Sequence, residues 1–452
     1  MSILKRLRLH PRQYFLFAFI FSALLLLISY SNSERITLSY RRVAHNSPEL
    51  NKQIEQLTAL PRTFNLSSGA APDTTGGNAT LIDADTLFQI ADALILKPSR
   101  PTCELTSAHR SRYSSLSSSQ TNDTLFLAIN LHNAAPILPA FLYSLSEFLT
   151  FVGPHRVHVS IYENGSTDAT PILLRLLATL LDQLGTPHTI LAKGSEVRIA
   201  DPTMKHKGGR IPVLAYVRNE ALAPLTSKKV KAAQVLFMND VIWCPADALE
   251  VLYQKDRQGA DMTCSVDWES DIVYDRWVIR AISGRAFYLV SDLSAYFHSI
   301  WRLFRRPVPP VLPDDPTSRE LFERDLPMQV FSCWNGMAAI SADVFLPPFN
   351  VHFRTAHNDL KQKGLKTDKE SECFLICVDL WKKGFGKIAV VKRASVAYDV
   401  AQYERVRKDR TIELVPSDAE ERILWQKDPP RAVAYHDWSK WETERWGTWD
   451  EA

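Results

Sequence analysis

The feature that most constrains this chain is a regular alternation of short apolar runs with longer segments whose apolar residues recur at helical spacing. The run 233–238 is apolar apart from Gln234, as expected of a strand covered on both faces. The segment 171–184 has proline in its first turn, leucines on one face and Gly185 after its last residue, which predicts a helix. Strands that alternate with helices form a mostly parallel, doubly wound sheet with flanking helices, so we predict an α/β fold. The predicted strands are 125–130, 156–162, 189–192, 233–238 and 261–266, and the predicted helices are 136–151, 171–184 and 212–222.

Composition excludes several classes of protein. The chain has 452 residues, of which 46% are hydrophobic and 23% charged, and this is the composition of a globular protein. The net charge is only +3, whereas a dedicated nucleic-acid binder normally carries a strong basic excess. We therefore expect no nucleic acid among the partners.

The N-terminus predicts a membrane anchor. Residues 1–13 form a basic tail without carboxylates, and residues 14–30 are uncharged and would span about 25 Å as a helix. The positive-inside rule places the tail in the cytosol and the rest of the chain in the lumen, as a single-pass type II protein of the Golgi or ER membrane. A cleaved signal peptide is the competing interpretation, but the residues after the apolar run match a cleavage site poorly.

Lumenal exposure changes how the next part of the chain is interpreted. Residues 31–121 are rich in Ser, Thr, Asn and Pro and predict a stem, followed by a catalytic domain at 122–400 and a Trp-rich extension at 401–452. Asn65, Asn78 and Asn122 each begin an N-glycosylation sequon. The six cysteines allow up to three disulfides, and the sequence assigns none of the pairings.

Polar residues that follow the predicted strands are the candidate site, because ligands bind beyond the carboxyl ends of strands in such sheets. Glu163 and Asn164 follow the second strand, and Asn239 and Asp240 follow the fourth. A carboxylate at the end of a buried strand is costly unless a cation or a cluster of donors meets it. Asp240, with the acids after the fifth strand, therefore suits a divalent metal, Mn²⁺ or Mg²⁺, that holds a diphosphate. For both segments the structural alternative is a turn that caps the next helix.

Several motifs, in this order along the chain, resemble the cryptococcal α-1,3-mannosyltransferase family, glycosyltransferase family 69, with its capsule-associated relatives. They are 126–133, 159–170, 214–219, Leu236-Phe-Met-Asn-Asp-Val241, 274–278, Ser332-Cys-Trp-Asn-Gly336, 372–381 and 384–388. The resemblance implies the GT-A fold, a single Rossmann-like sheet in which a strand-end motif, usually Asp-x-Asp, holds the metal. It also implies transfer of mannose from GDP-mannose to a mannoside or oligosaccharide acceptor, with retention of the α configuration.

The resemblance and the residue types together assign roles within this site. The candidate donor-binding residues are Glu163, Asn164, Arg210, Arg218, Asn219 and Asn239. The candidate catalytic carboxylates are Asp267, Asp275 and Glu372, and the candidate acceptor contacts are Trp277, Trp334 and Asn335. Asp240 is the predicted metal ligand. The further ligands of the metal stay open among Asp267, His352 and His357. Structural alternatives stay open as well: a helix N-terminal charge for Glu372, an exposed helix face for Arg218 and Asn219, and a buried core position for Trp334.

One departure from the family pattern keeps other functions open. The segment Asn239-Asp-Val241 offers one carboxylate, whereas Asp-x-Asp offers two. A catalytically weak scaffold, or a sugar-binding subunit of a polysaccharide-synthesising assembly, is therefore the alternative to an active enzyme. A UDP-sugar transferase on the same fold is the other alternative.

Overall fold

The structure is a computed structural model that describes residues 48–68, 84–94, 101, 103–117, 120–121, 123–193, 210–289, 291–293, 296, 308–356, 370–408, 422–436 and 444–450. The chain divides into two compact units, Met1–Leu60 with Leu81–Pro98, and Pro61–Thr80 with Ser99–Ala452. In the smaller unit the described elements are two helices, α2 (Pro48–Ala59) and α3 (Ala84–Ala93).

Three predictions from the N-terminal part fall on residues that the structure leaves undescribed. The predicted anchor at 14–30 and the sequons at Asn78 and Asn122 lie outside the described residues. Within the described ranges, no helix has the length and apolar character needed to cross a membrane. Asn65 is described, and its side chain is exposed on an edge strand of the larger unit.

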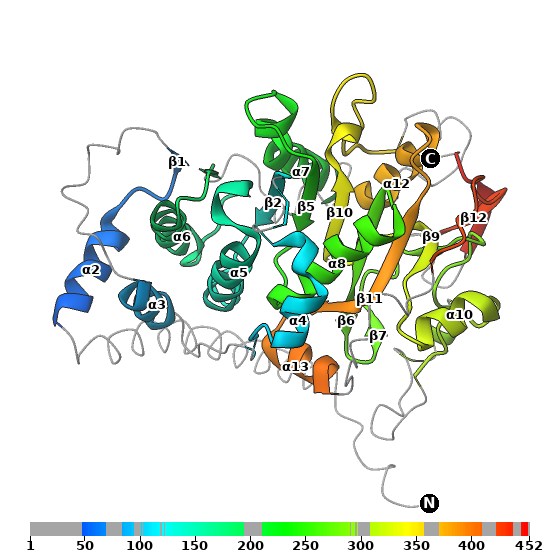
Figure 1. Cartoon of the computed structure of the whole chain (residues 1–452), viewed down its shortest axis with the longest axis horizontal. Helices are drawn as coiled ribbons and strands as arrows, with labels where there is room; N and C mark the ends of the chain where they lie inside the picture. The colour runs from blue at the N-terminus through cyan, green and yellow to red at the C-terminus, as the bar shows by residue number, and fades with distance from the viewer. Residues whose placement is uncertain are drawn as a thin grey trace, which may run out of the picture. The chain divides into compact units, whose positions relative to one another are not determined.

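The first half of the large sheet has the predicted alternation of strands and helices (Figure 1). Four parallel strands lie in the order β4-β3-β2-β5. Their bounds are β2 (Leu125–Leu131), β3 (Val157–Glu163), β4 (His188–Ala192) and β5 (Gln234–Met238), and the helices between them are α5 (Leu138–Val152), α6 (Thr170–Leu184) and α7 (Arg210–Thr226). The chain winds outward from β2 through β3 to β4 and then returns to add β5 on the other side of β2. The strand order therefore reverses between β2 and β5, which is where doubly wound sheets bind ligands.

The second half of the sheet adds antiparallel strands to the predicted mostly parallel arrangement, so the sheet as a whole is mixed. β10 (Met337–Ser341) is inserted antiparallel between β5 and β6 (Met262–Glu269), and β6 then pairs in parallel with β11 (Ile388–Ala397). β9 (Met328–Ser332) is antiparallel to β11, and the short strands β7 (Ile272–Val273) and β8 (Arg280–Ala281) pair with β6 and β9. The insertion of β10 joins residues far apart in sequence, so the local apolar pattern could not reveal it.

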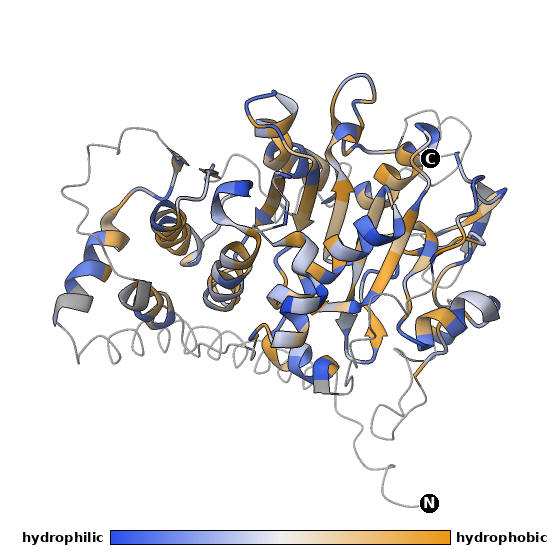
Figure 2. Ribbon diagram, viewed as in Figure 1, coloured by the Kyte–Doolittle hydropathy of each residue, from blue (hydrophilic) through white to orange (hydrophobic). Residues whose placement is uncertain are grey.

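Helices cover both faces of this sheet. α5 packs against α6 and α8 (Pro245–Gln258), whereas α7 packs against α12 (Glu372–Lys382) (Figure 1). Side chains of α7 and α12 share one apolar core with β2, β5, β6 and β9. Figure 2 shows the same division, with the strands mostly in the hydrophobic colour and the hydrophilic residues on the outer sides of the helices. The burial of both sheet faces explains why residues 235–238 of this run are all apolar.

Parts of the predicted stem belong to the larger unit. β1 (Phe64–Ser67) adds an antiparallel edge strand to β4. Cys103 forms a disulfide with Cys244, and Arg112 of α4 (Ser107–Arg112) forms a buried ion pair with Glu250 at 2.8 Å. The folded body thus begins before residue 122, and the Ser-rich composition of this segment concealed its buried residues.

The Trp-rich extension also contributes to the folded body. α13 (Val400–Lys408) packs on β11, and β12 (Ala432–His436) pairs with β13 (Glu444–Thr448) in a separate hairpin. Gly284 accepts a hydrogen bond from the Ala434 N–H at 2.9 Å and has a φ of +82°. A Cβ at this position would lie 2.1 Å from the Ala432 carbonyl oxygen, so only glycine allows the hairpin to approach so closely.

We expect the Cys103–Cys244 disulfide to stabilise the fold. Its removal in C103A/C244A opens a loop with a sequence separation of 141, and the loop-entropy model gives a loss of about 2–5 kcal/mol in the free energy of unfolding. Urea unfolding measures the loss, and peptide mapping without reductant checks the pairing. The map should show free thiols at Cys373 and Cys377. A disulfide at either of those cysteines would contradict the structure.

Candidate active site

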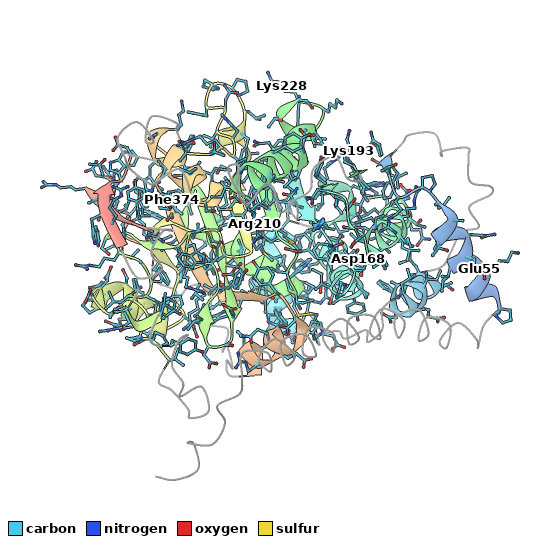
Figure 3. The ribbon with its side chains drawn as sticks, turned by 180° about the vertical axis from the view of Figure 1, so that it is seen from behind. Glu55, Asp168, Lys193, Arg210, Lys228 and Phe374 are labelled. Carbon is cyan, nitrogen blue, oxygen red and sulfur yellow. A yellow bond between two sulfur atoms is a disulfide. The ribbon has the colours of Figure 1, made fainter. Side chains whose placement is uncertain are left out.

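The residues that follow β2 and β5 meet at the point where the strand order reverses. His132 follows β2, and Asn239 and Asp240 follow β5. Asp240 is half-buried, and burial raises its pKa, while Arg210, Arg218 and His132 oppose the shift with positive charge. Arg210 is the exposed first residue of α7 (Figure 3). The predicted strand-end carboxylate therefore lies where a ligand is expected, among cationic groups that suit an anionic one.

Arg218 on α7 is the best-connected of these cations. Its Nε donates to Glu372 Oε1 at 3.0 Å, and its Nη1 donates to Asn239 Oδ1 at 3.0 Å. The guanidinium carbon lies 4.6 Å from the centre of the Trp334 ring, and the rings of Phe237 and Phe353 are at 5.3 and 5.6 Å. Arg218 is only 6% exposed, so its charge is stabilised by the ion pair and by cation–π contacts rather than by water.

Glu372 is the acidic partner of Arg218 and the first residue of α12. Ser371 caps this helix, since its side chain accepts a hydrogen bond from the Cys373 N–H at 3.2 Å. Glu372 is 2% exposed, which is tolerable because its carboxylate meets both the helix N-terminus and Arg218. The position of Glu372 matches the structural alternative of a charge at a helix N-terminus, and its ion pair with Arg218 links α12 to α7.

Two further carboxyl groups lie beside this ion pair. Asp267, near the end of β6, is fully buried and accepts from Asn335 Nδ2 at 2.9 Å and from the Asp275 N–H at 3.1 Å. Burial raises the pKa of Asp267 to about 6. Burial also raises the pKa of Asp275 well above its usual value, and the negative charges of Asp267 and Glu372 add to that shift while Arg218 opposes it. Of the three predicted catalytic residues, Asp275 is partly exposed, whereas Asp267 and Glu372 are buried.

Tyr398 is a site residue that the sequence analysis did not single out. It follows β11, and its hydroxyl donates to Asp267 Oδ2 at 3.4 Å. Its ring lies 4.7 Å from that of Tyr274, which is 38% exposed. Both tyrosines lie at the edge of the sheet where Asp240, Asp267 and Asp275 follow or end strands, and we call this edge the rim. The rule that polar residues follow strands would have found Tyr398 and His132, had it been applied to every strand.

The structure corrects the predicted acceptor role of Trp334 and Asn335. Both side chains are fully buried, so an acceptor sugar cannot contact them in this conformation. Asn335 adopts a φ of +49° in the link between β9 and β10, and its amide holds Asp267. The Trp334 indole N–H donates to Asn239 Oδ1 at 3.1 Å. Trp277 is half-buried with the Arg276 guanidinium 5.2 Å from its ring, and its acceptor role stays a prediction.

Glu163 and Asn219 are occupied by contacts to the backbone, and Asn164 is buried. Glu163 and Asn164 are each 1% exposed, and the Glu163 carboxylate accepts from the Ser166 N–H within the turn. The Asn219 amide makes two hydrogen bonds with the backbone of Phe353, at 2.8 and 3.0 Å. The geometry of residues 163–168 matches the alternative of a helix-capping turn, and Asn219 has a structural role. The structure therefore gives no support for direct contact between these three side chains and a nucleotide-sugar donor.

The residues of this site fit a metal ion only if a bound substrate supplies most of the atoms that coordinate the ion. Within the described ranges, no group of three or more His, Cys, Asp and Glu side chains is arranged to hold a metal ion. His352 is exposed and contacts the Asn350 carbonyl, Asp267 is occupied as described above, and His357 lies outside the described residues. Magnesium, however, is commonly held by one or two carboxylates together with substrate phosphates. Asp240 supplies one such carboxylate, in a place where burial disfavours its charge and a cation would restore it.

We expect the Arg218–Glu372 pair to hold the body together. Arg218→Met keeps an apolar stem but leaves Glu372 and its neighbouring carboxyls buried without their cation, which should lower the free energy of unfolding by about 3–5 kcal/mol. The matched control is Arg324→Met, which breaks the exposed Arg324–Glu320 pair and should cost less than about 1 kcal/mol. Urea unfolding followed by circular dichroism measures both. Equal stability of the two variants would show that the buried pair contributes little.

Comparison with solved structures gives weak likenesses. TarS 1–349 of Staphylococcus aureus matches with a TM-score of 0.33 and 11% identity, covering 63% of each chain, less than two thirds of that protein's length. The mannosyltransferase PcManGT of Pyrobaculum calidifontis, in complex with GDP-Man and Mn²⁺, matches with a TM-score of 0.33 and 13% identity, covering 69% of this chain and 68% of its own. Likeness at this level carries no argument about this chain.

Comparison with known sequences gives stronger matches. An alpha-1,3-mannosyltransferase of Cryptococcus neoformans var. neoformans serotype D is 34% identical over 373 residues, which cover 76% of each chain. The family model described as cryptococcal mannosyltransferase 1 matches residues 124–379, a range that contains all the rim residues named above except Tyr398. The chain therefore belongs to the cryptococcal mannosyltransferase 1 family.

Proposed function

We propose that the chain is an α-1,3-mannosyltransferase that moves mannose from GDP-mannose to a mannoside or other glycan acceptor, with retention of configuration. Family membership makes it a glycosyltransferase, and the name of its 34% identical relative supports mannose as the sugar and α-1,3 as the linkage. The observation that carries the proposal is the rim itself. Asp240 and a set of arginines lie at the switch point of the sheet, beside three acidic side chains.

The two halves of this rim suit the two ends of a nucleotide-sugar bond. Breaking that bond builds negative charge on the diphosphate and positive charge at the anomeric carbon. Arg210 is exposed next to Asp240 and can approach the diphosphate. Asp275 is the partly exposed member of the acidic group, and it is our candidate to approach the sugar. Retention requires either a nucleophilic carboxylate or entry of the acceptor on the leaving group's own face, and Asp275 is our candidate for contact with the sugar in both routes.

A divalent metal, Mn²⁺ or Mg²⁺, is part of the proposal, with Asp240 as the protein residue that would hold it. When bound, such an ion supplies positive charge to the leaving diphosphate. The chain's own contribution is to keep Asp240 at the strand end and to keep Arg210 and His132 beside it. Placement in the Golgi or ER membrane through residues 14–30 stays a prediction from the sequence.

The donor assignment predicts a ranking of nucleotides. Calorimetry should show that GDP with a divalent metal binds more tightly than UDP with the same metal. A panel of nucleotide sugars with simple mannosides should then show turnover with GDP-mannose, and NMR of the product should show an α linkage. Tighter binding of UDP would indicate a UDP-sugar transferase, whereas binding without turnover of any donor would favour the scaffold function.

The metal assignment predicts the behaviour of Asp240→Asn. This change keeps the shape of the side chain and removes the anionic ligand, so the rate should fall by on the order of 10²-fold or more and metal-dependent GDP binding should weaken. Asp182→Asn, in a side chain that is 64% exposed at the end of α6, is the matched control and should leave the rate unchanged. Thermal unfolding should confirm that both variants are folded. Near-normal turnover in Asp240→Asn, or full activity in excess chelator, would contradict the metal assignment. Arg210 and Arg218 alone would then neutralise the charge of the diphosphate.

A further inference from the structure

We propose that the ring of Tyr274 is the platform on which a sugar ring of the glycan acceptor stacks. The Tyr274 side chain is 38% exposed, which sets it apart from the many buried aromatic side chains of the described residues. It directly precedes Asp275, our candidate for contact with the donor sugar. The inference rests on the proposed function and adds the part of the site that binds the acceptor.

Asp267 fixes the backbone that carries the Tyr274 ring. The Tyr274 N–H donates to the Asp267 carbonyl oxygen at 2.9 Å, and the Asp275 N–H donates to Asp267 Oδ1 at 3.1 Å. Asp267 is itself fully buried near the end of β6. Two successive residues are therefore held by one buried residue. The ring is in place before a ligand arrives, so binding loses little conformational entropy.

Tyr398 supports the Tyr274 ring from one side. The two ring centres lie 4.7 Å apart, and the ring planes are tilted by 55°. The Tyr398 hydroxyl donates to Asp267 Oδ2 at 3.4 Å, so the supporting ring is bonded to the same buried residue. The exposed part of Tyr274 is then a flat apolar surface at the rim, backed by a second ring. Such a surface matches the C–H face of a hexose ring, while polar groups beside it can meet the sugar hydroxyls.

The register of the strands fixes how far this surface lies from Asp240. Ala338 of β10 pairs with both Phe237 of β5 and Cys264 of β6. Asp240 and Asp267 each come three residues later, so they lie at about the same level of the sheet. One strand separates β5 from β6, and neighbouring strands lie about 4.8 Å apart, so these two positions are roughly 10 Å apart along the rim.

This separation puts Tyr274 on the acceptor side of the proposed site. With the diphosphate held at Asp240, the donor sugar lies between Asp240 and the Asp267 end of the rim, where Asp275 can meet its reacting carbon. Tyr274 follows β7, on that same end of the rim, and is more exposed than Asp275. A ring that is beside the reacting centre, and open to solvent, lies where an incoming acceptor arrives.

Steady-state kinetics of the full-length chain with a mannoside acceptor tests the proposal. Tyr274→Leu keeps an apolar side chain against Tyr398 but removes the flat ring, so the KM for the acceptor should rise about 10-fold or more while kcat stays within about threefold of wild type. Tyr274→Phe keeps the ring, and its acceptor KM should stay within about threefold of wild type. A wild-type acceptor KM in Tyr274→Leu, or equal rises in both variants, would overturn the proposal.

The matched control is Tyr143→Leu. Tyr143 lies on α5 and is 37% exposed, so this change removes an equally exposed ring away from the acidic end of the rim. Its acceptor KM should stay within about twofold of wild type. An equal rise in Tyr143→Leu and Tyr274→Leu would overturn the proposal, because the effect would not depend on the place of the ring.

Transfer of the donor sugar to water separates an acceptor platform from a donor platform. In this reaction water replaces GDP at the anomeric carbon and gives mannose and GDP, so no glycan takes part. Tyr274→Leu should release GDP from GDP-mannose at the wild-type rate when the acceptor is left out. A slower release, or a donor KM that rises as much as the acceptor KM, would place the ring against the donor and overturn the acceptor assignment.

Binding measurements distinguish a failure of this inference from a failure of the proposed function. If the wild-type chain turns over no donor, the proposed function fails, and saturation-transfer NMR with methyl α-mannoside then decides the inference. Weaker mannoside signals in Tyr274→Leu than in both wild type and Tyr143→Leu would support the platform. Equal signals in the three proteins, or no signal in the wild type, would overturn it.

Discussion

The buried guanidinium of Arg218 is the interaction on which this site depends. Glu372 opens α12, Asp267 lies near the end of β6, and Asp275 follows β7, so three acidic side chains converge from separate elements. Burying that many carboxyl groups without a cation would cost several kcal/mol each. Arg218 bonds directly to one of them and opposes the raised pKa of another. The aromatic rings around it keep water away, which strengthens these attractions and makes the arrangement rigid.

Much of the fold could be predicted from the sequence because its first half is encoded locally. The strands β2 to β5 and the helices between them lie within a few residues of the predicted bounds, since apolar period and helix-end signals are short-range. The mixed second half could not be predicted in this way. The position of β10 between β5 and β6 depends on pairings such as Ala338 with Phe237 and with Cys264, and no local pattern specifies which strands become neighbours.

The sequence indicated where a candidate site lies, but less of its detail. The rule that ligands bind beyond strand ends pointed to Asp240 and Asp267, which the structure places at or near the ends of strands. It could not tell which side chains face inward. Trp334 and Asn335 suit a sugar by residue type, yet the link between β9 and β10 turns both into the core, where they hold Asn239 and Asp267. A motif shows that its residues belong to one site, and only the backbone path shows which of them can touch a ligand.

In the proposed function, the division of charge on the rim would make a single carboxylate after β5 sufficient. Arg218 influences Asp240 on one side and Asp275 on the other, so it is shared between the diphosphate end and the sugar end of the proposed donor. If the diphosphate were neutralised by Arg218 alone, the acidic group would lose its cation when the donor binds. The proposed cation at Asp240, together with Arg210, would leave Arg218 paired with Glu372. A second carboxylate at position 239 would compete for Arg218 instead, and the amide found there makes no such demand.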